Sequence, residues 1–576
     1  MSDLLIMGSG VVGNFAAAYF RRYFPSLRVT VVGRSDQELP IVGESLVELS
    51  THFLQDLGLS RYLIEQHLPK YGLTYYYKLD PSRPRDPGYI VDEAPSNPPF
   101  PSFLINRFSF DAELRRLNRQ RGVRCIQGKV TGVSLGKSEP HRVTVQHADG
   151  REEPLEARWL VDATGRRRLL ARRLGLQSEA PHQRSAFWFR LVDFDPSILD
   201  RIHAVKKVNR SYDSYYCTHH FFGQGNWVWL IPVRSEDSRR MISIGLTYRP
   251  DLFPGSITNT REFLDWMARE HPLVGDFVKS GEIVDTNVYR NYMYRAKQRY
   301  SSQGWFLIGD AADTVDPLYS TGLALASLSI QQVGAMVRRD LEGRLSEAFV
   351  NDLDRAYAGV HGTASDMVGT LYEAMEDGFQ CHLRMNLSIS TMFHLAIPLI
   401  LNGYYTDSVG ARLAARFGGS TGMIRQLRRF DPLIARAAKK LSPPAPEHFI
   451  KVQSSFTLNF PFFEYHREED IPRSISQMFR HMTALRWRLL RLAGIHSWFD
   501  PVQLGGLVQT LVSALAVACF GRRSLKNSGL IRWLVAPQSD RLHRGASGSE
   551  AEGPAKPWLR KVAERLPVSR RLRLPS

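Results

Sequence analysis

The sequence predicts an α/β fold: a Rossmann-like nucleotide-binding unit with an inserted antiparallel sheet, followed by a C-terminal helical region. Three observations predict it. Residues 3–35 form a strand, a glycine-rich turn, a helix and a second strand in that order. Residues 180–300 alternate aromatic and polar side chains, as antiparallel strands with two different faces do. From about residue 345 to 535, the apolar residues have helical spacing.

A glycine-rich turn opens the nucleotide-binding unit. The run Gly8-Ser9-Gly10-Val11-Val12-Gly13 fits G-x-G-x-x-G and directly follows an apolar strand. Gly8 makes the tight turn, Gly10 lets backbone N–H groups approach a pyrophosphate, and Gly13 lets the helix pack on the strand. Val11 and Val12 lie at the helix N-terminus that faces the phosphates. The context predicts dinucleotide binding.

The end of the second strand departs from the usual pattern. Arg28-Val29-Thr30-Val31-Val32 is followed by Gly33-Arg34, where such units carry an acid for the ribose hydroxyls. The pyrophosphate end of the site is therefore better defined than the adenosine end.

Three later segments extend the cofactor site. They are V-G-E-S-L at 42–46, a strand ending in D-A-T-G at 162–165, and a strand ending in G-D-A-A at 309–312. The four motifs together resemble an FAD-binding Rossmann-like unit of the glutathione-reductase type. The resemblance assigns these further residues to the cofactor: Gly43, Glu44, Ser45, Asp310, Ala311 and Pro317.

Two tryptophans add a more specific signal. Trp227 and Trp229 lie two residues apart in the string Trp227-Val228-Trp229-Leu230-Ile231-Pro232, so they share one face of a strand. Alone, this string is equally typical of an aromatic core. With the flavin motifs, W-x-W-x-I-P resembles the flavin-dependent halogenases, specifically the phenol/pyrrole-type branch of the tryptophan halogenase superfamily. In that family the tryptophan pair is the barrier between flavin and substrate.

The resemblance also implies a halide site and a catalytic lysine. Asp313–Gly322 looks like the family's D-P-x-x-S-[ST]-G loop, which maps halide binding onto Thr321 and Gly322. The alternative is a generic flavin-capping loop, which hydroxylases share. Lys70, in Pro69-Lys70-Tyr71-Gly72, maps onto the catalytic lysine, with Lys78 as a second candidate. The alternative is an ordinary surface lysine.

Two positions depart from the family pattern. Tyr319 stands where tryptophan-specific members have a glutamate, so free tryptophan is not the expected substrate. Thr314 replaces a phenylalanine that many members carry, which leaves the halide geometry less defined.

The resemblance implies an FAD-dependent halogenase acting in secondary metabolism. Reduced FAD, dioxygen and chloride or bromide give hypohalous acid, which Lys70 directs onto an electron-rich aromatic that is either free or carried by an acyl carrier protein. Only one nucleotide fingerprint is visible, so a separate flavin reductase is the expected partner. The alternatives are an FAD-dependent aromatic hydroxylase or a flavin reductase of an isoprenoid-like substrate. Neither metal-ligand spacing nor a nucleic-acid partner is predicted.

Composition and hydropathy complete the expectations. We expect an FAD unit at 1–345 with the sheet inserted at about 180–300, a capping helical region at 346–535, and a linker and basic tail at 536–576. The net charge of +18 favours an acidic partner. The apolar segments 385–406 and 501–521 are expected to be core helices, with peripheral membrane contact as the alternative. Isolated cysteines and the absence of a signal peptide predict a cytoplasmic protein.

Overall fold

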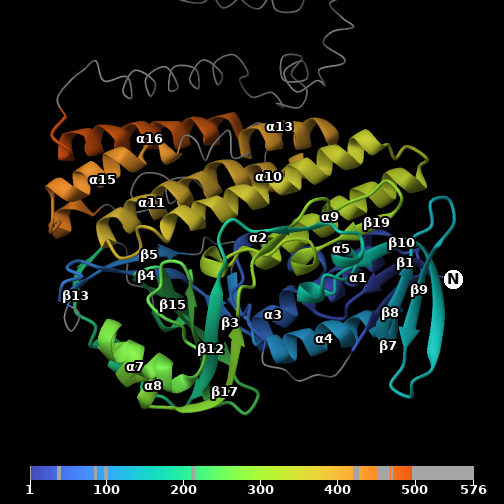
Figure 1. Cartoon of the computed structure of the whole chain (residues 1–576), viewed down its shortest axis with the longest axis horizontal. Coiled ribbons are helices and arrows are strands. Elements are labelled where there is room, and N and C mark those ends of the chain that lie inside the picture. Colours follow the sequence, from blue (N-terminus) through green and yellow to red (C-terminus); the bar gives the residue numbers. More distant parts are fainter. Residues whose placement is uncertain are drawn as a thin grey trace, which may run out of the picture.

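Two β-sheets lie side by side beneath a layer of C-terminal helices in the computed structural model (Figure 1). The structure describes residues 2–34, 41–83, 87–95, 102–208, 214–418, 427–449, 468 and 471–495. The predicted tail 536–576 and the apolar segment 501–521 lie outside the described residues.

The first sheet has seven strands in the order β7-β2-β1-β10-β9-β8, with β19 also paired to β10. Its strands are β1 (Ser2–Met7), β2 (Val29–Gly33), β7 (Arg124–Gln127), β8 (Lys129–Ser134), β9 (His141–Gln146), β10 (Glu152–Asp162) and β19 (Trp305–Leu307). The β7, β2, β1, β10 and β19 pairings are parallel. The central strands β1, β2 and β19 are almost entirely buried, as strands covered on both faces are. This sheet is the predicted Rossmann-like unit.

The second sheet has eight strands in the order β13-β5-β4-β14-β15-β16-β12-β17. Its strands are β4 (Gly72–Lys78), β5 (Tyr89–Pro95), β12 (Ser185–Val192), β13 (Ala204–Lys207), β14 (Cys217–Gly223), β15 (Asn226–Arg234), β16 (Arg240–Tyr248) and β17 (Glu282–Tyr289). The expected antiparallel sheet at about 180–300 is present, but it also recruits β4 and β5 from an earlier segment. It is mixed, since β14 pairs with β4, and β13 with β5, in parallel.

Two smaller sheets have two strands each. They are β3 (Leu68–Lys70) with β6 (Ser102–Leu104), and β11 (Gln177–Glu179) with β18 (Tyr294–Ala296). Strand β3 packs against β15, so this small sheet lies beside the tryptophan-bearing strand.

Helices of the first 341 residues surround the two sheets. They are α1 (Val11–Tyr23), α2 (Glu48–Asp56), α3 (Ser60–Gln66), α4 (Arg107–Gln120), α5 (Leu169–Arg173), α6 (Ser197–Asp200), α7 (Thr260–Glu270), α8 (Pro272–Lys279) and α9 (Gly322–Leu341). Helices α7 and α8 cover one face of the second sheet, where Phe263 and Phe277 join the core with Phe187 and Ile244 (Figure 1).

The C-terminal helices cover the opposite face of the second sheet and the edge of the first (Figure 1). They are α10 (Glu347–Leu371), α11 (Gly378–Thr391), α12 (Ile397–Leu401), α13 (Ser408–Gly418), α15 (Asp431–Lys440) and α16 (Ile471–Leu492). Side-chain caps fix where two of them begin: Ser346 accepts a hydrogen bond from Phe349 N, and Asp377 accepts one from Gln380 N.

One helical stretch among the described residues is long and apolar enough to cross a membrane. It runs from Gly378 to Leu401 through α11, the π turn η5 (Met392–Ala396) and α12. Of its most apolar window, 72% is buried against other parts of the protein. That burial is consistent with the core helix expected at 385–406.

Candidate active site

The glycine turn forms a cradle that only small residues fit. Gly8 has φ of +118°, and a Cβ there would lie 2.2 Å from Ala163 O on the neighbouring strand. A Cβ on Gly13 would lie 2.0 Å from Gly8 O, so the α1–β1 packing also requires glycine. Gly10 is exposed, and a Cβ there would meet open space. It begins α1 without a side-chain cap, leaving the first backbone N–H groups of the helix available to an anion.

Asp310 is exposed to solvent in the short turn that follows β19. Protein atoms packed around its carboxyl raise the pKa of Asp310, while Arg166 and Arg107 act in the opposite direction. The side chain nonetheless remains accessible to solvent. A solvent-accessible carboxylate on which two arginines act electrostatically is suited to the ribityl and pyrophosphate region of FAD. The residues present therefore fit the cofactor that the sequence predicts.

The 42–46 segment connects the cofactor side to the rest of the site. Arg107 Nη1 donates to Val42 O at 2.6 Å, and its guanidinium pairs with Asp111 at 2.9 and 3.0 Å, with both side chains buried. Glu44 is buried beside Arg107. A cavity of about 420 Å³ borders Glu44 and Arg107 and opens between α4 and β12, β15, β16 and β17.

Ser45 and Leu46 of this segment contact the loop before α9 and the candidate catalytic lysine. Ser45 Oγ lies 3.0 Å from Thr218 Oγ1 on β14 and accepts from Ser320 Oγ at 3.0 Å. Leu46 O accepts a 2.8 Å hydrogen bond from Lys70 Nζ. The 42–46 segment therefore brings Lys70 and the loop before α9 together, although 250 residues separate them in sequence.

Lys70 is not a surface lysine. It ends β3 and is 3% exposed, and burial lowers its pKa to about 8, partly opposed by Glu48 and Cys217. Lys70 also acts electrostatically on His220, whose pKa falls to about 3, mainly through burial. Lys78 is different: its ammonium forms a 2.9 Å ion pair with Glu270 of α7, at the other face of the sheet.

The tryptophan pair lies on the face of the second sheet that meets the C-terminal helices. The rings of Trp227 and Trp229 are 5.6 Å apart, and His220 lies 5.5 Å from Trp227. Cross-strand register places Tyr75, His220 and Trp229 in one row across β4, β14 and β15. The sequence pattern alone did not single out His220, although the alternation of β14 could have placed it on this face.

The loop before α9 carries the predicted halide residues. Asp316 Oδ1 accepts from Leu318 N, which starts the short turn η4 (Pro317–Tyr319). Ser320 follows with φ of +55°, and Thr321 then begins α9 without a side-chain cap. Thr321 and Gly322 are accessible, so the positive end of the 20-residue helix is open to an anion.

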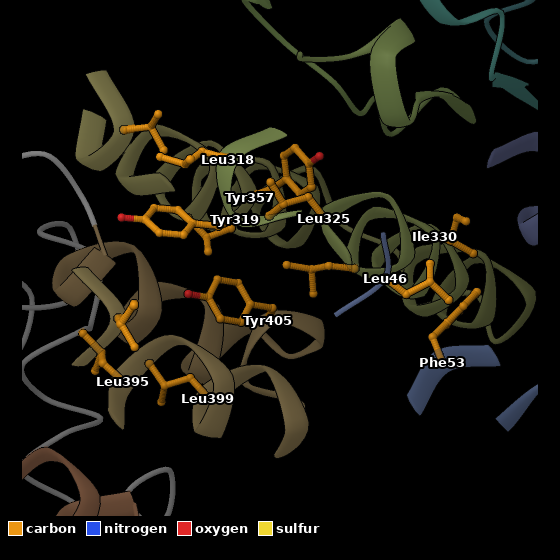
Figure 2. Close-up of a cluster of buried hydrophobic side chains, with 14 of the residues drawn as sticks. Leu46, Phe53, Leu318, Tyr319, Leu325, Ile330, Tyr357, Leu395, Leu399 and Tyr405 are labelled. Atoms are coloured by element: carbon orange, nitrogen blue, oxygen red, sulfur yellow. The ribbon is translucent and has the colours of Figure 1, made fainter. Parts of the chain in front are cut away.

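Helices α10 and α11 hold this loop from the other side. His361 Nε2 lies 2.9 Å from Thr314 O, and Tyr319 Oη donates to Met385 Sδ at 3.1 Å. Figure 2 shows Tyr319 and Leu318 in the same apolar cluster as Leu395 of the C-terminal helices. Leu46 of the 42–46 segment belongs to it too, so the cluster packs both sides of the site together.

Several site features were not predicted from the sequence. They include the Arg107–Asp111 pair, which its i, i+4 spacing could have revealed, and the polar contacts of Asp316 with other parts of the chain. Within the described part of the chain, no group of three or more His, Cys, Asp or Glu side chains is placed to hold a metal ion.

The fold and this site define a flavin-dependent oxidoreductase. A family profile described as tryptophan halogenase matches residues 3–77 and 92–395, and the chain belongs to that family. It is 26% identical over 435 residues to a flavin-dependent halogenase, chlA, of Dictyostelium discoideum, covering 70% of this chain and 71% of that one. It is also 27% identical over 344 residues to the 1H-pyrrole-2-carbonyl-[peptidyl-carrier protein] chlorinase of Pseudomonas fluorescens, covering 56% and 73%.

Solved structures agree on the fold. The halogenase PltM in complex with phloroglucinol and FAD superposes with a TM-score of 0.63 at 17% identity, covering 84% of this chain and 96% of that chain. The flavin-dependent brominase Bmp2 gives a TM-score of 0.54 at 20% identity, covering 75% and 99%. The protein is an FAD-dependent halogenase, and the FAD, halide and dioxygen requirements predicted from the sequence are confirmed at this level.

The chain's own groups have separable tasks around the cofactor. Bound FAD, when reduced, supplies the electrons that activate dioxygen for halide oxidation. The backbone around Gly10 and the Asp310 side chain are the groups that would bind and orient it, and Arg107 fixes the 42–46 segment through its hydrogen bond to Val42 O. The buried Trp227 and Trp229 would keep water out on the side of the second sheet that faces the C-terminal helices. Lys70 holds an amine proton within this dry region, at 2.8 Å from Leu46 O.

Proposed function

We propose that this halogenase acts on an electron-rich aromatic of the phenol or pyrrole type, with Lys70 directing the halogen. The observation that carries the proposal is the placement of Lys70. It is a 3% exposed amine on β3, which packs against the tryptophan strand β15, and it is hydrogen-bonded to the segment that also contacts Ser320. An amine there can hydrogen-bond hypohalous acid or be halogenated itself, and either route aims an electrophilic halogen at a nearby ring.

The substrate class is supported by Tyr319 and by relatives. The Tyr319 hydroxyl is engaged with Met385, and a phenol cannot replace a carboxylate in binding an amino acid's ring N–H. Among the similar proteins, two act on pyrrole-2-carbonyl groups on peptidyl carrier proteins, and PltM was solved with phloroglucinol, a phenol. A tryptophan 2-halogenase is also similar, at 23% identity.

The test is mass spectrometry of products. The holoprotein, a flavin reductase, NADH and FAD are incubated with phloroglucinol, with pyrrole-2-carboxylate and with the same pyrrole acyl group on a carrier protein, in chloride and in bromide. The proposal predicts mass gains of one halogen per ring. Products that gain oxygen and not halogen would instead support the hydroxylase alternative.

Lysine variants test the role of Lys70. Lys70→Ala is expected to retain FAD and to consume dioxygen with reduced flavin, but to lose product halogenation. Lys78→Ala is the matched control, because this second buried lysine pairs with Glu270 on the other face. Retention of most halogenation by Lys70→Ala, or an equal loss in both variants, would contradict the assignment.

We also propose that the aromatic is presented by an acidic carrier protein. The chain carries a net charge of +18, which accelerates encounter with an acidic partner and makes it dependent on salt. Halogenation of a carrier-bound acyl group should weaken as salt rises from 50 to roughly 500 mM, while halogenation of the free acid should change little. Vesicle binding that is lost on deleting residues 540–576 would favour the membrane alternative.

A further inference from the structure

The first tryptophan of the pair is hydrogen-bonded to a side chain outside the second sheet. Trp227 Nε1–H donates to Tyr372 Oη at 2.9 Å, and Tyr372 Oη–H donates to Asp316 Oδ2 at 2.7 Å. Tyr372 follows the last turn of α10, and Asp316 belongs to the loop before α9. The chain of contacts therefore joins β15 to that loop through the helical layer.

A fourth side chain completes the network. Arg184 Nε donates to the same Asp316 Oδ2 at 2.8 Å, and its guanidinium carbon lies 4.1 Å from the centre of the Tyr372 ring. The second carboxylate oxygen of Asp316 accepts from Leu318 N and so fixes the turn η4. Asp316 thus couples the turn geometry to both Arg184 and Tyr372.

Burial fixes which group donates and which accepts in each of these hydrogen bonds. All four residues are at most 2% exposed, and a buried polar group without a partner is costly. Burial raises the pKa of Tyr372 well above its usual value, so the phenol keeps its proton and acts as a donor to the carboxylate. Its oxygen is then the acceptor for the Trp227 indole. Loss of the Tyr372 hydroxyl therefore removes a hydrogen-bond partner from both Trp227 and Asp316.

We propose that Tyr372 is a positioning residue that holds Trp227 and the loop before α9 in register and thereby sets the geometry of the halide site. The loop leads from Asp316 through η4 and Ser320 to Thr321 and Gly322 without an intervening element. A rotation of the Asp316 carboxylate shifts the start of α9, where the anion would bind. The inference rests on the proposed halide role of Thr321 and Gly322.

The test compares two conservative variants. Tyr372→Phe keeps the ring under Arg184 and removes only the bridging hydroxyl. Tyr300→Phe is the matched control: Tyr300 is also fully buried, and its hydroxyl donates one 2.9 Å hydrogen bond, to Gln332, outside the network. Both are purified as holoproteins and compared at equal FAD content.

Bromide affinity, peroxide release and bromide kinetics are then measured. Bromide is titrated into the oxidised holoprotein, and the change in flavin absorbance gives its affinity without any turnover. Peroxide released per NADH consumed is then measured with a flavin reductase present, together with the bromide KM and kcat. Tyr372→Phe removes both hydrogen bonds of the hydroxyl, and it should weaken bromide binding by roughly threefold to tenfold, a change of the size of one net hydrogen bond. It should also raise the bromide KM more than it lowers kcat, and increase peroxide release.

A double variant tests whether Trp227 and Tyr372 affect bromide binding through their shared hydrogen bond. Trp227→Phe removes the indole donor, so the bromide affinity of Trp227→Phe/Tyr372→Phe should equal that of the weaker single variant and not the product of the two losses. Equal bromide affinity in Tyr372→Phe and Tyr300→Phe overturns the inference. If neither wild type nor any variant binds bromide, the halide role of Thr321 and Gly322 fails and the inference fails with it. If wild type binds bromide and Tyr372→Phe binds it equally well, only the role of Tyr372 fails.

Discussion

The indole of Trp229 lies directly over Gly245 of the neighbouring strand, where a Cβ would come within 2.1 Å of ring atom Cζ2. The two residues are register partners on β15 and β16. The indole Nε1–H also donates to Ser243 Oγ at 3.4 Å, two residues along the same strand. The second tryptophan is therefore placed by a glycine that the sequence motif does not include.

The first prediction concerns this glycine. Gly245→Ala should push the Trp229 ring away from β16, because the clash is with a rigid indole and cannot be relieved by a flexible side chain. Overpacking of this kind typically costs about 1–3 kcal/mol of unfolding free energy. Displacement of the barrier should also lower the yield of halogenated product per dioxygen consumed. Urea unfolding and product analysis measure the two effects.

A helical glycine serves as the control for that substitution. A Cβ on Gly362 of α10 would meet nothing within 4 Å, so Gly362→Ala should be neutral or slightly stabilising. Equal stability and equal product yield for Gly245→Ala and wild type would show that Trp229 can move without consequence.

The nucleotide-binding half of the fold could be predicted because its signals are local. The glycine turn, its flanking strands and α1 occupy one continuous segment, and the structure has the expected strand, helix (Val11–Tyr23) and second strand there in that order. Helices α10 to α16 were likewise predicted as a region by their apolar spacing. The second sheet was only partly predicted, because pairing β4 with β14 is a parallel contact between segments 145 residues apart.

The candidate site was likewise predicted only in part. Trp227, Trp229 and Lys70 could be named from motifs, but their partners could not. Tyr372 reaches Asp316 across 56 residues and Trp227 across 145, and no periodicity records such a contact. The burial of Lys70 also depends on the pairing of β3 with β6, which local sequence does not indicate.

The second prediction is that Lys70→Met makes the protein more stable at neutral pH. Burial lowers the pKa of Lys70 to about 8 from about 10.5 in the unfolded chain, so below pH 8 the folded state carries an unfavourable charge. The unfolded state binds more protons between these values, so wild-type stability rises with pH there. After allowing for the lost bond to Leu46, the variant should gain about 1–2 kcal/mol at pH 7.

The pH dependence separates this effect from better packing. The advantage of Lys70→Met should shrink as the pH rises from about 8 to about 10.5, because the wild-type amine is then neutral in the folded state and its deprotonation on folding costs less at each higher pH. Urea unfolding at pH 7 and pH 9.5 provides the comparison. Lys78→Met, which breaks the ion pair with Glu270, should gain nothing at either pH. A Lys70→Met advantage that is the same at both pH values would exclude the titration of Lys70 as its cause.

The third prediction concerns the buried ion pair beside the cofactor site. Asp111→Ala leaves the Arg107 guanidinium buried without its carboxylate, which typically costs about 3–5 kcal/mol. Arg107 also holds Val42 O, so FAD affinity should fall with stability. Glu65→Ala removes the exposed i, i+4 partner of Arg61 and should cost less than about 0.5 kcal/mol. Urea unfolding and fluorescence titration with FAD test both, and equal losses in the two variants would refute the prediction.

The last prediction concerns the source of electrons. The chain contains one G-x-G-x-x-G fingerprint, at Gly8–Gly13, and that one fits the FAD pyrophosphate. The purified holoprotein should therefore oxidise NADH or NADPH slowly, and an unrelated flavin reductase should restore halogenation. FAD reduced by light, with no nicotinamide present, should support product formation equally well, with catalase added to remove free peroxide. Rapid NADPH oxidation by the protein alone, accelerated by an aromatic substrate, would instead indicate a nicotinamide site within this chain and favour hydroxylase-like reduction of the flavin.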